Sequence, residues 1–144
     1  MACFLSLFLL YSHGMDERLD LGIREFNEGR CFEAHDILED LGQGYREPDR
    51  VLLQALIHAA VGFYHLDNGN LKGCRSQLLK ACTKMRALLP EYWGLLLDPL
   101  HSSMKKHIDL IDEQWQSKAE SLDLLVRPKI QRGHRVAGGY LSIS

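Results

Sequence analysis

A chain of 144 residues with 46% hydrophobic and 25% charged residues has the length and composition of one soluble globular domain. A net charge of −2 and only 4 prolines argue against a disordered, a collagen-like or a strongly basic nucleic-acid-binding chain. None of the four cysteines stands in a metal-binding spacing, so we expect free thiols in a reducing, cytoplasmic compartment. They are Cys3, Cys31, Cys74 and Cys82.

The chain begins with an apolar run from Met1 to Ser12. This run is too short to span a bilayer, and no Lys or Arg precedes it as in a secretory signal, which is the alternative interpretation. A regular amphipathic pattern begins at Asp16, directly after Met15. We therefore expect residues 1–14 to be an extension outside the fold, with Met15 as the start, and no membrane association.

Helical periodicity continues through the rest of the chain, and no stretch shows the alternation expected of a half-buried strand. Gly29, the cluster at residues 67–70 and Pro90 are placed to end helices, while Asp98 and Pro99 are placed to begin one. The predicted helices cover residues 16–27, 31–41, 51–66, 71–89 and 99–122. The fold class predicted is all-α, a single five-helix bundle-like domain over residues 15–126, followed by a basic, flexible tail over residues 127–144.

Charge is distributed unevenly along the chain. Residues 16–49 are rich in acids, whereas residues 71–89 contain basic residues and no acid. We interpret both as solvated faces that attract each other weakly across neighbouring helices. RNA contact through the basic helix and tail is the alternative, but no aromatic or motif pattern accompanies it, so we do not expect a nucleic-acid partner. The sequence leaves a homo-oligomer open.

The third predicted helix, VLLQALIHAAVGFYHL, carries no charged residue over residues 51–66, which is typical of a helix surrounded by other helices. Its polar side chains Gln54, His58 and His65 fall within about 40° of one another on an ideal helix. Buried imidazole and amide groups cost roughly 1 to 3 kcal/mol each when unpaired. We therefore expect polar partners from a neighbouring helix.

The second predicted helix offers such partners, because His35 and Glu39 lie four residues apart at the edge of its apolar face. Together with His58 and His65 they would form a set of imidazole and carboxylate ligands suited to a divalent metal, with Zn first and Fe or Mn as alternatives. A simpler interpretation is an ion pair between His35 and Glu39 on the helix surface and a hydrogen-bonded core histidine at position 65. We expect His13, His101, His107 and His134 to be solvated.

The segments FNEGRCFEAHDILEDL and LLQALIHAAVGFYHLDNGNLKGC resemble domain-of-unknown-function family 309, an all-helical family that carries the generic label of predicted metal-dependent hydrolase. The resemblance covers residues 24–79. Its motif is similar to F-N-x-G-x-x-(aromatic)-E-A-H-E-x-L-E-x-x-W, then L-I-Q, then H-x-x-x-G-N-x-x-G-A. Carried over by position, the resemblance implicates Glu33, His35, Glu39, His65 and Asn70, with Phe26, Asn27 and Gly29 in the preceding turn.

The chain departs from this pattern at four positions. Gly42 stands where the family has Trp, and His58 where it has Gln; Asp36 replaces Glu and Cys74 replaces Ala. Loss of the Trp removes a large packing group beside the site, and His58 adds a fourth candidate ligand.

The function predicted is metal binding between the second and third helices, with hydrolysis of a small ester, amide or phosphate by metal-activated water. His35, Glu39, His65 and His58 are the predicted ligands, supported by Gln54 and Asn70. Glu33 is the predicted general base by its place in the motif, although it projects about 160° from His35 on an ideal helix. The alternative is a noncatalytic helical scaffold for protein association, whose His and Glu residues form a hydrogen-bonded network.

Overall fold

The computed structural model describes residues 17–114, 125–136 and 139–143. The expected extension at residues 1–14, Cys3, and the predicted end of the fifth helix with Trp115 and Leu122 lie outside these residues. His13 and the side chain of His134 lie outside them too.

Helices form most of the described fold. A first helix covers residues 17–27 and precedes α2 (Cys31–Gly42), α3 (Asp49–Asp67), α4 (Leu71–Met85) and α5 (Leu97–Gln114). The short 3-10 helix η1 (Arg86–Leu88) follows α4 directly. The predicted all-α, five-helix bundle-like fold is confirmed, with ends that differ by a few residues.

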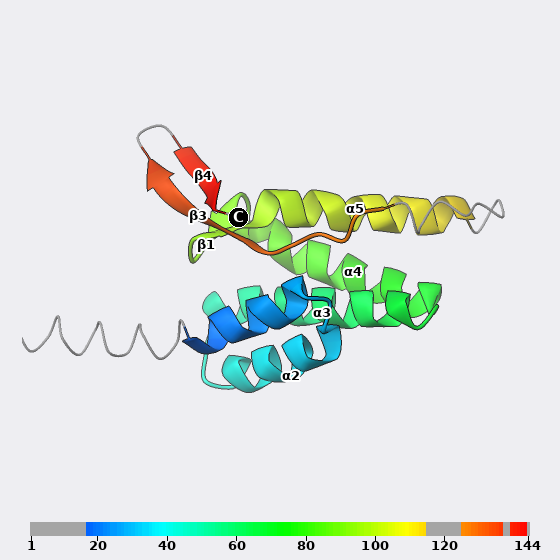
Figure 1. Ribbon diagram of the computed structural model, residues 1–144, viewed down its shortest axis with the longest axis horizontal. Coiled ribbons are helices and arrows are strands. Elements are labelled where there is room, and N and C mark those ends of the chain that lie inside the picture. Colours follow the sequence, from blue (N-terminus) through cyan, green and yellow to red (C-terminus); the bar gives the residue numbers. More distant parts are fainter. Residues whose placement is uncertain (1–16, 115–124, 137–138, 144) are drawn as a thin grey trace, which may run out of the picture.

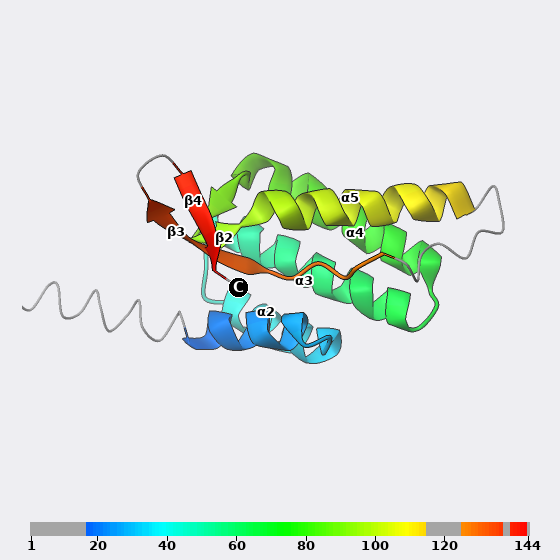
Figure 2. The ribbon, with the colours of Figure 1, turned by 45° about the horizontal axis from the view of Figure 1, so that its top comes forward.

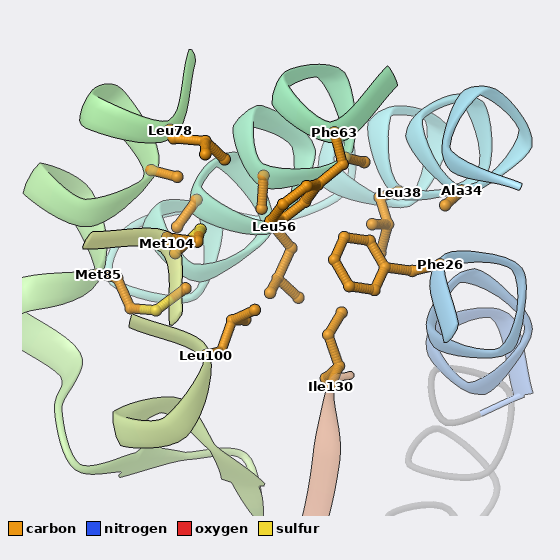
Figure 3. Close-up of a cluster of buried hydrophobic side chains, with 14 of the residues drawn as sticks. Phe26, Ala34, Leu38, Leu56, Phe63, Leu78, Met85, Leu100, Met104 and Ile130 are labelled. Atoms are coloured by element: carbon orange, nitrogen blue, oxygen red, sulfur yellow. The ribbon is translucent and has the colours of Figure 1, made fainter. Parts of the chain in front are cut away.

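The central position predicted for the charge-free helix is also confirmed. α3 packs against α2 on one side and α4 on the other, and α4 packs against α5 (Figures 1 and 2). Small residues of α3 let its neighbours approach closely. At Gly62, an added Cβ would lie 2.7 Å from Cδ2 of Leu78 on α4. Figure 3 shows Leu56 and Phe63 of α3 in the middle of the core, between side chains of the other helices.

A β-hairpin connects η1 to α5, and the sequence did not indicate it. β1 (Glu91–Tyr92) pairs antiparallel with β2 (Leu95–Leu96). Trp93 and Gly94 form the turn with φ of 54° and 73°, as a two-residue turn of the I′ type requires. Strands of two residues are too short to show alternation, which explains why periodicity missed them.

The expectation of a flexible tail from Arg127 differs from the structure over residues 127–136. The segment from residue 125 to Ile130 runs beside α5 (Figures 1 and 2) and leads into β3 (Gln131–Val136). β3 pairs antiparallel with β2 and with β4 (Gly139–Ile143), which completes a sheet of order β1-β2-β3-β4. The partners of β3 on β2 lie more than thirty residues away, so local sequence does not reveal the pairing.

Ile130 anchors this segment to the helices. Its side chain is buried, and Figure 3 shows it pointing toward Phe26. Asn27 donates from Nδ2 to the Ile130 carbonyl at 3.0 Å, and its Oδ1 accepts from the Ile130 N–H at 2.8 Å. One amide side chain thus satisfies both backbone groups of Ile130, as a neighbouring strand would do.

Arg127 adds a second attachment. Its guanidinium lies over the ring of Phe63, 5.0 Å from the centroid, and forms an ion pair with Asp67. The basic residues that indicated a solvated tail therefore include one that covers a core aromatic ring.

His107 is a further correction, because it is fully buried rather than solvated. Its Nδ1 donates to the Ser103 carbonyl at 2.8 Å, and its ring meets the Phe63 ring edge to face at 5.1 Å. Its Nε2 has no hydrogen-bond partner among the described atoms. Burial lowers the pKa of His107, and the positive charge of Arg127 lowers it further. His101 is half-buried, and burial lowers its pKa too.

The described cysteines agree with the expectation of free thiols. Cys31, Cys74 and Cys82 are buried and unpaired, and burial raises the pKa of each thiol to about 11. In the described part of the chain, no helix combines the length and the apolar character needed to cross a bilayer.

Candidate functional site

His35 and Glu39 contact each other along the surface of α2. Nε2 of His35 lies 2.9 Å from Oε2 of Glu39, and the Glu39 side chain is 59% exposed. Nδ1 of His35 is buried and lies 3.2 Å from Asp36 Oδ1, but no hydrogen bond satisfies it. This contact matches the simpler interpretation of the two residues, an ion pair between His35 and Glu39 on the helix surface.

His65 lies at the C-terminal end of α3, where the chain turns into α4. Nδ2 of Asn70 lies 3.4 Å from Nδ1 of His65, and Oδ1 of Asn70 accepts from the Gly73 N–H at 2.9 Å. Asn70 therefore caps α4 and contacts His65 with the same amide group. Because the amide nitrogen can only donate, neutral His65 carries its own proton on Nε2.

One cavity of about 170 Å³ holds both His35 and His65. It lies between α2 and α3, and we call it the His35–His65 pocket. Its lining is mostly apolar and aromatic, and consists of Cys31, Phe32, His35, Val61, Tyr64 and His65.

Four rings follow one another around this pocket. The Phe32 centroid lies 6.0 Å from that of His35 and 5.6 Å from that of Tyr64, and Tyr64 lies 6.0 Å from His65. Phe32 is 52% exposed and Tyr64 40% exposed. Neither Phe32 nor Tyr64 is among the predicted site residues. Phe32 occupies the aromatic position of the motif and Tyr64 directly precedes His65, and these positions are the signal that could have found them.

A second and larger cavity, of about 460 Å³, lies between α2, α3 and α4, and we call it the α2–α4 groove. Glu39, Gln54 and His58 line this groove and not the His35–His65 pocket. The full lining is Glu39, Gly42, Gln43, Arg50, Leu53, Gln54, Ile57, His58 and Lys84.

The polar partners of Gln54 and His58 come from α4 rather than from α2. Nδ1 of His58 lies 2.8 Å from Oε1 of Gln77, and Nζ of Lys84 donates to Oε1 of Gln54 at 3.1 Å. The expectation that these side chains need partners is met, but the predicted helix was the wrong one. Periodicity gives the direction of a side chain on its own helix and not the identity of the neighbour.

The predicted metal ligands are therefore divided between two cavities. His35 and His65 share the pocket, while Glu39 and His58 share the groove. Among the residues that the structure describes, no three His, Cys, Asp or Glu side chains form a group that could hold a metal ion. The predicted four-ligand centre does not fit this arrangement. Glu33, the predicted general base, is exposed on α2 and lines neither cavity.

Several residues of the motif have structural roles. Gly29 and Gly69 have φ of 84° and 72°, which glycine adopts without strain at the ends of helices. At Gly73, an added Cβ would lie 2.6 Å from Asn70 Nδ2 and 3.0 Å from His65 Cδ2. Asn27 holds Ile130, as described above. The motif thus builds the two helix connections that position His35 and His65.

Comparison with protein-family models matches part of the chain. Residues 19–77 match the model of a family described as Domain of unknown function (DUF309), which confirms the resemblance found in the sequence. The match ends within α4, so α5 and the sheet lie outside it. No curated protein matches the chain.

Proposed function

We propose that the part of the chain that matches the DUF309 family model, residues 19–77, is a noncatalytic binding domain. Its ligand inserts one aromatic ring with a polar substituent into the His35–His65 pocket. The observation that carries this proposal is the set of partly exposed rings, Phe32 and Tyr64, beside a cavity between the two motif histidines. Exposed aromatic side chains around a pocket are characteristic of binding sites.

The size of the pocket supports a single ring. An apolar cavity of about 150 Å³ is large enough to bind benzene in a protein interior. The His35–His65 pocket has a volume of about 170 Å³, and its wall includes Val61 and Cys31. A phenyl or phenol ring fits this volume, whereas a fused polycyclic ligand does not.

The histidines supply the polar contact. Asn70 occupies Nδ1 of His65 and Glu39 occupies Nε2 of His35, which fixes both rings. No described residue hydrogen-bonds to Nε2 of His65, so this N–H is available to donate to a ligand oxygen. A phenolic hydroxyl combines the ring with such an oxygen, and a tyrosine side chain of a partner carries this group.

A titration with p-cresol, the side-chain analogue of tyrosine, tests the proposal by NMR. We expect chemical-shift changes at Cys31, Val61 and His65. Val61→Phe fills the pocket and should abolish these changes, whereas Leu79→Phe, a matched change on the exposed surface of α4, should leave them intact. Absence of shifts at about 10 mM ligand, or equal binding by Val61→Phe, would contradict the proposal.

A divalent-metal site at the same pocket is a second candidate, with Zn before Fe or Mn. One observation favours it, because His35 has a carboxylate at Nε2 and a buried Nδ1 without a hydrogen bond. Histidine ligands of metals commonly have this carboxylate on the second nitrogen. A bound ion would supply activated water. Glu33, the predicted general base, lies outside the pocket.

Elemental analysis of the purified protein separates the two candidates. Metal near one ion per chain, lost in both His35→Ala and His65→Ala, supports the metal site. A folded protein without metal that still binds p-cresol supports the binding domain.

A further inference from the structure

The α2–α4 groove has a different lining from the His35–His65 pocket and a different chemistry. We propose that this groove binds a small monocarboxylate with an apolar body. The apolar body packs on the partly buried side chain of Ile57, and the carboxylate lies between Lys84 and Arg50. A volume of about 460 Å³ falls within the range of small-molecule sites in proteins.

Gly42 lines the groove without a side chain. Its φ is not positive, so the backbone does not require glycine at this position. An added Cβ would lie 3.7 Å from the Leu53 Cβ, an ordinary van der Waals contact. The backbone therefore does not require glycine here, and a side chain larger than a methyl group would extend past Leu53 toward the groove.

Two cations supply the attraction for an anion. Lys84 reaches the groove from α4 and is held half-buried by its hydrogen bond to Gln54, while Arg50 lies at the first turn of α3. Among the described residues, no carboxylate lies within ion-pair distance of either cation. Both positive charges are thus available to a ligand.

The acid in the groove limits the charge of that ligand. Glu39 lines one side of the groove, and its carboxylate contacts His35. A second negative charge on the ligand would be repelled by Glu39, so a monoanion is favoured over a phosphate dianion. The partly exposed apolar surface of Ile57 adds affinity for a ring or a branched aliphatic body.

Benzoate is the probe for this proposal, and benzyl alcohol is its uncharged counterpart. In an NMR titration of the full chain, benzoate should shift the amide signals of Gly42 and Gln43. Lys84→Gln should weaken binding about tenfold, because a charge-assisted contact is lost. Lys80→Gln removes an equal charge from an exposed position of α4 outside the groove, and should leave the affinity unchanged.

The space beside Gly42 is tested separately. Gly42→Trp should fill the groove and abolish benzoate binding. Gly42→Ala adds only a methyl group in ordinary contact, so it should fold and bind benzoate as the parent does. Val61→Phe, which blocks the other pocket, should bind benzoate as the parent does. This variant therefore distinguishes benzoate binding in the groove from ligand binding in the His35–His65 pocket.

Three results would overturn the proposal. They are the absence of benzoate shifts at about 10 mM, equal weakening by Lys84→Gln and Lys80→Gln, and equal affinity for benzyl alcohol. The second would indicate attraction to surface charge in general, and the third would indicate that charge has no part in binding.

Discussion

Asn70 links a structural role to the candidate site through one amide group. Its oxygen accepts from the Gly73 N–H at the start of α4, and its nitrogen contacts the His65 ring. Gly73 permits this arrangement because a side chain at position 73 would overlap with both residues. The orientation of His65 therefore depends on the cap of the next helix.

Two substitutions of Asn70 separate these roles. Asn70→Ala should lower the free energy of unfolding by about 1 kcal/mol, the usual cost of losing an N-cap. Asn70→Asp keeps the accepting oxygen and should retain most of this stability, while it removes the donor to His65. Urea unfolding measures the first effect, and the NMR signals of the His65 ring measure the second. Equal stability of Asn70→Ala and the parent would contradict the assigned cap.

His107 makes stability depend on pH. Its pKa is lowered by burial in the folded protein, whereas the unfolded chain protonates the same ring near the usual value of about 6.5. The unfolded state therefore binds more protons just below that value, and stability falls as the pH drops below about 6.5. The loss ends once the pH passes the lowered pKa of the folded state.

His107→Gln should reduce this loss below about pH 6.5, because glutamine does not titrate. His101 is half-buried with a lowered pKa as well, so some of the dependence should remain. Urea unfolding at several pH values gives the slope for each protein. The same slope in the variant and the parent would show that His107 is not buried in its neutral form.

At the scale of elements, the approach of α3 to α4 depends on Gly62. An added Cβ there would lie 2.7 Å from Cδ2 and 3.0 Å from Cγ of buried Leu78, which has no room to move away. Gly62→Ala should therefore lower stability by about 1 to 3 kcal/mol. Gly42→Ala is the matched control, and should raise stability by about 0.5 to 1 kcal/mol because it improves the helix without a clash. Thermal unfolding of the two variants should shift in opposite directions.

The segment before β3 contributes to the core through Ile130. Its side chain packs by Phe26, and Asn27 satisfies its backbone. Ile130→Ala should lower the free energy of unfolding by about 2 to 4 kcal/mol. Its exposed neighbour offers a control, since Lys129→Ala should change stability by less than about 0.5 kcal/mol. Similar unfolding midpoints for the two variants would mean that the segment does not hold the core together.

At the scale of the whole molecule, the sequence predicts the helices well because their signals are local. The charge-free stretch identifies α3 as the central helix, and Gly29 marks the end of the helix before α2. The sheet has no such signal, because β1 and β2 are two residues long and β3 pairs with a distant strand. The prediction that His107 is solvated was wrong. The neighbouring lysines are exposed, but they lie on another side of α5 from His107.

The candidate site shows the same division between local and distant information. The contact of His35 with Glu39 follows from their spacing on one helix. His35 and His65 line one cavity between α2 and α3. The partner of His58 is Gln77 on α4, which the sequence does not indicate, because the rotation of one helix against its neighbours is set by packing over the whole core.

Among the described residues, Glu39 contacts His35 and His65 contacts Asn70, and a double-mutant cycle tests most directly whether Glu39 and His65 form one centre. Urea unfolding gives the free energies of the parent, Glu39→Ala, His65→Ala and the double variant, each as purified and without added metal. Independent sites predict effects that add within about 0.5 kcal/mol. A coupling energy above about 1 kcal/mol would instead place both residues in one centre and contradict the account.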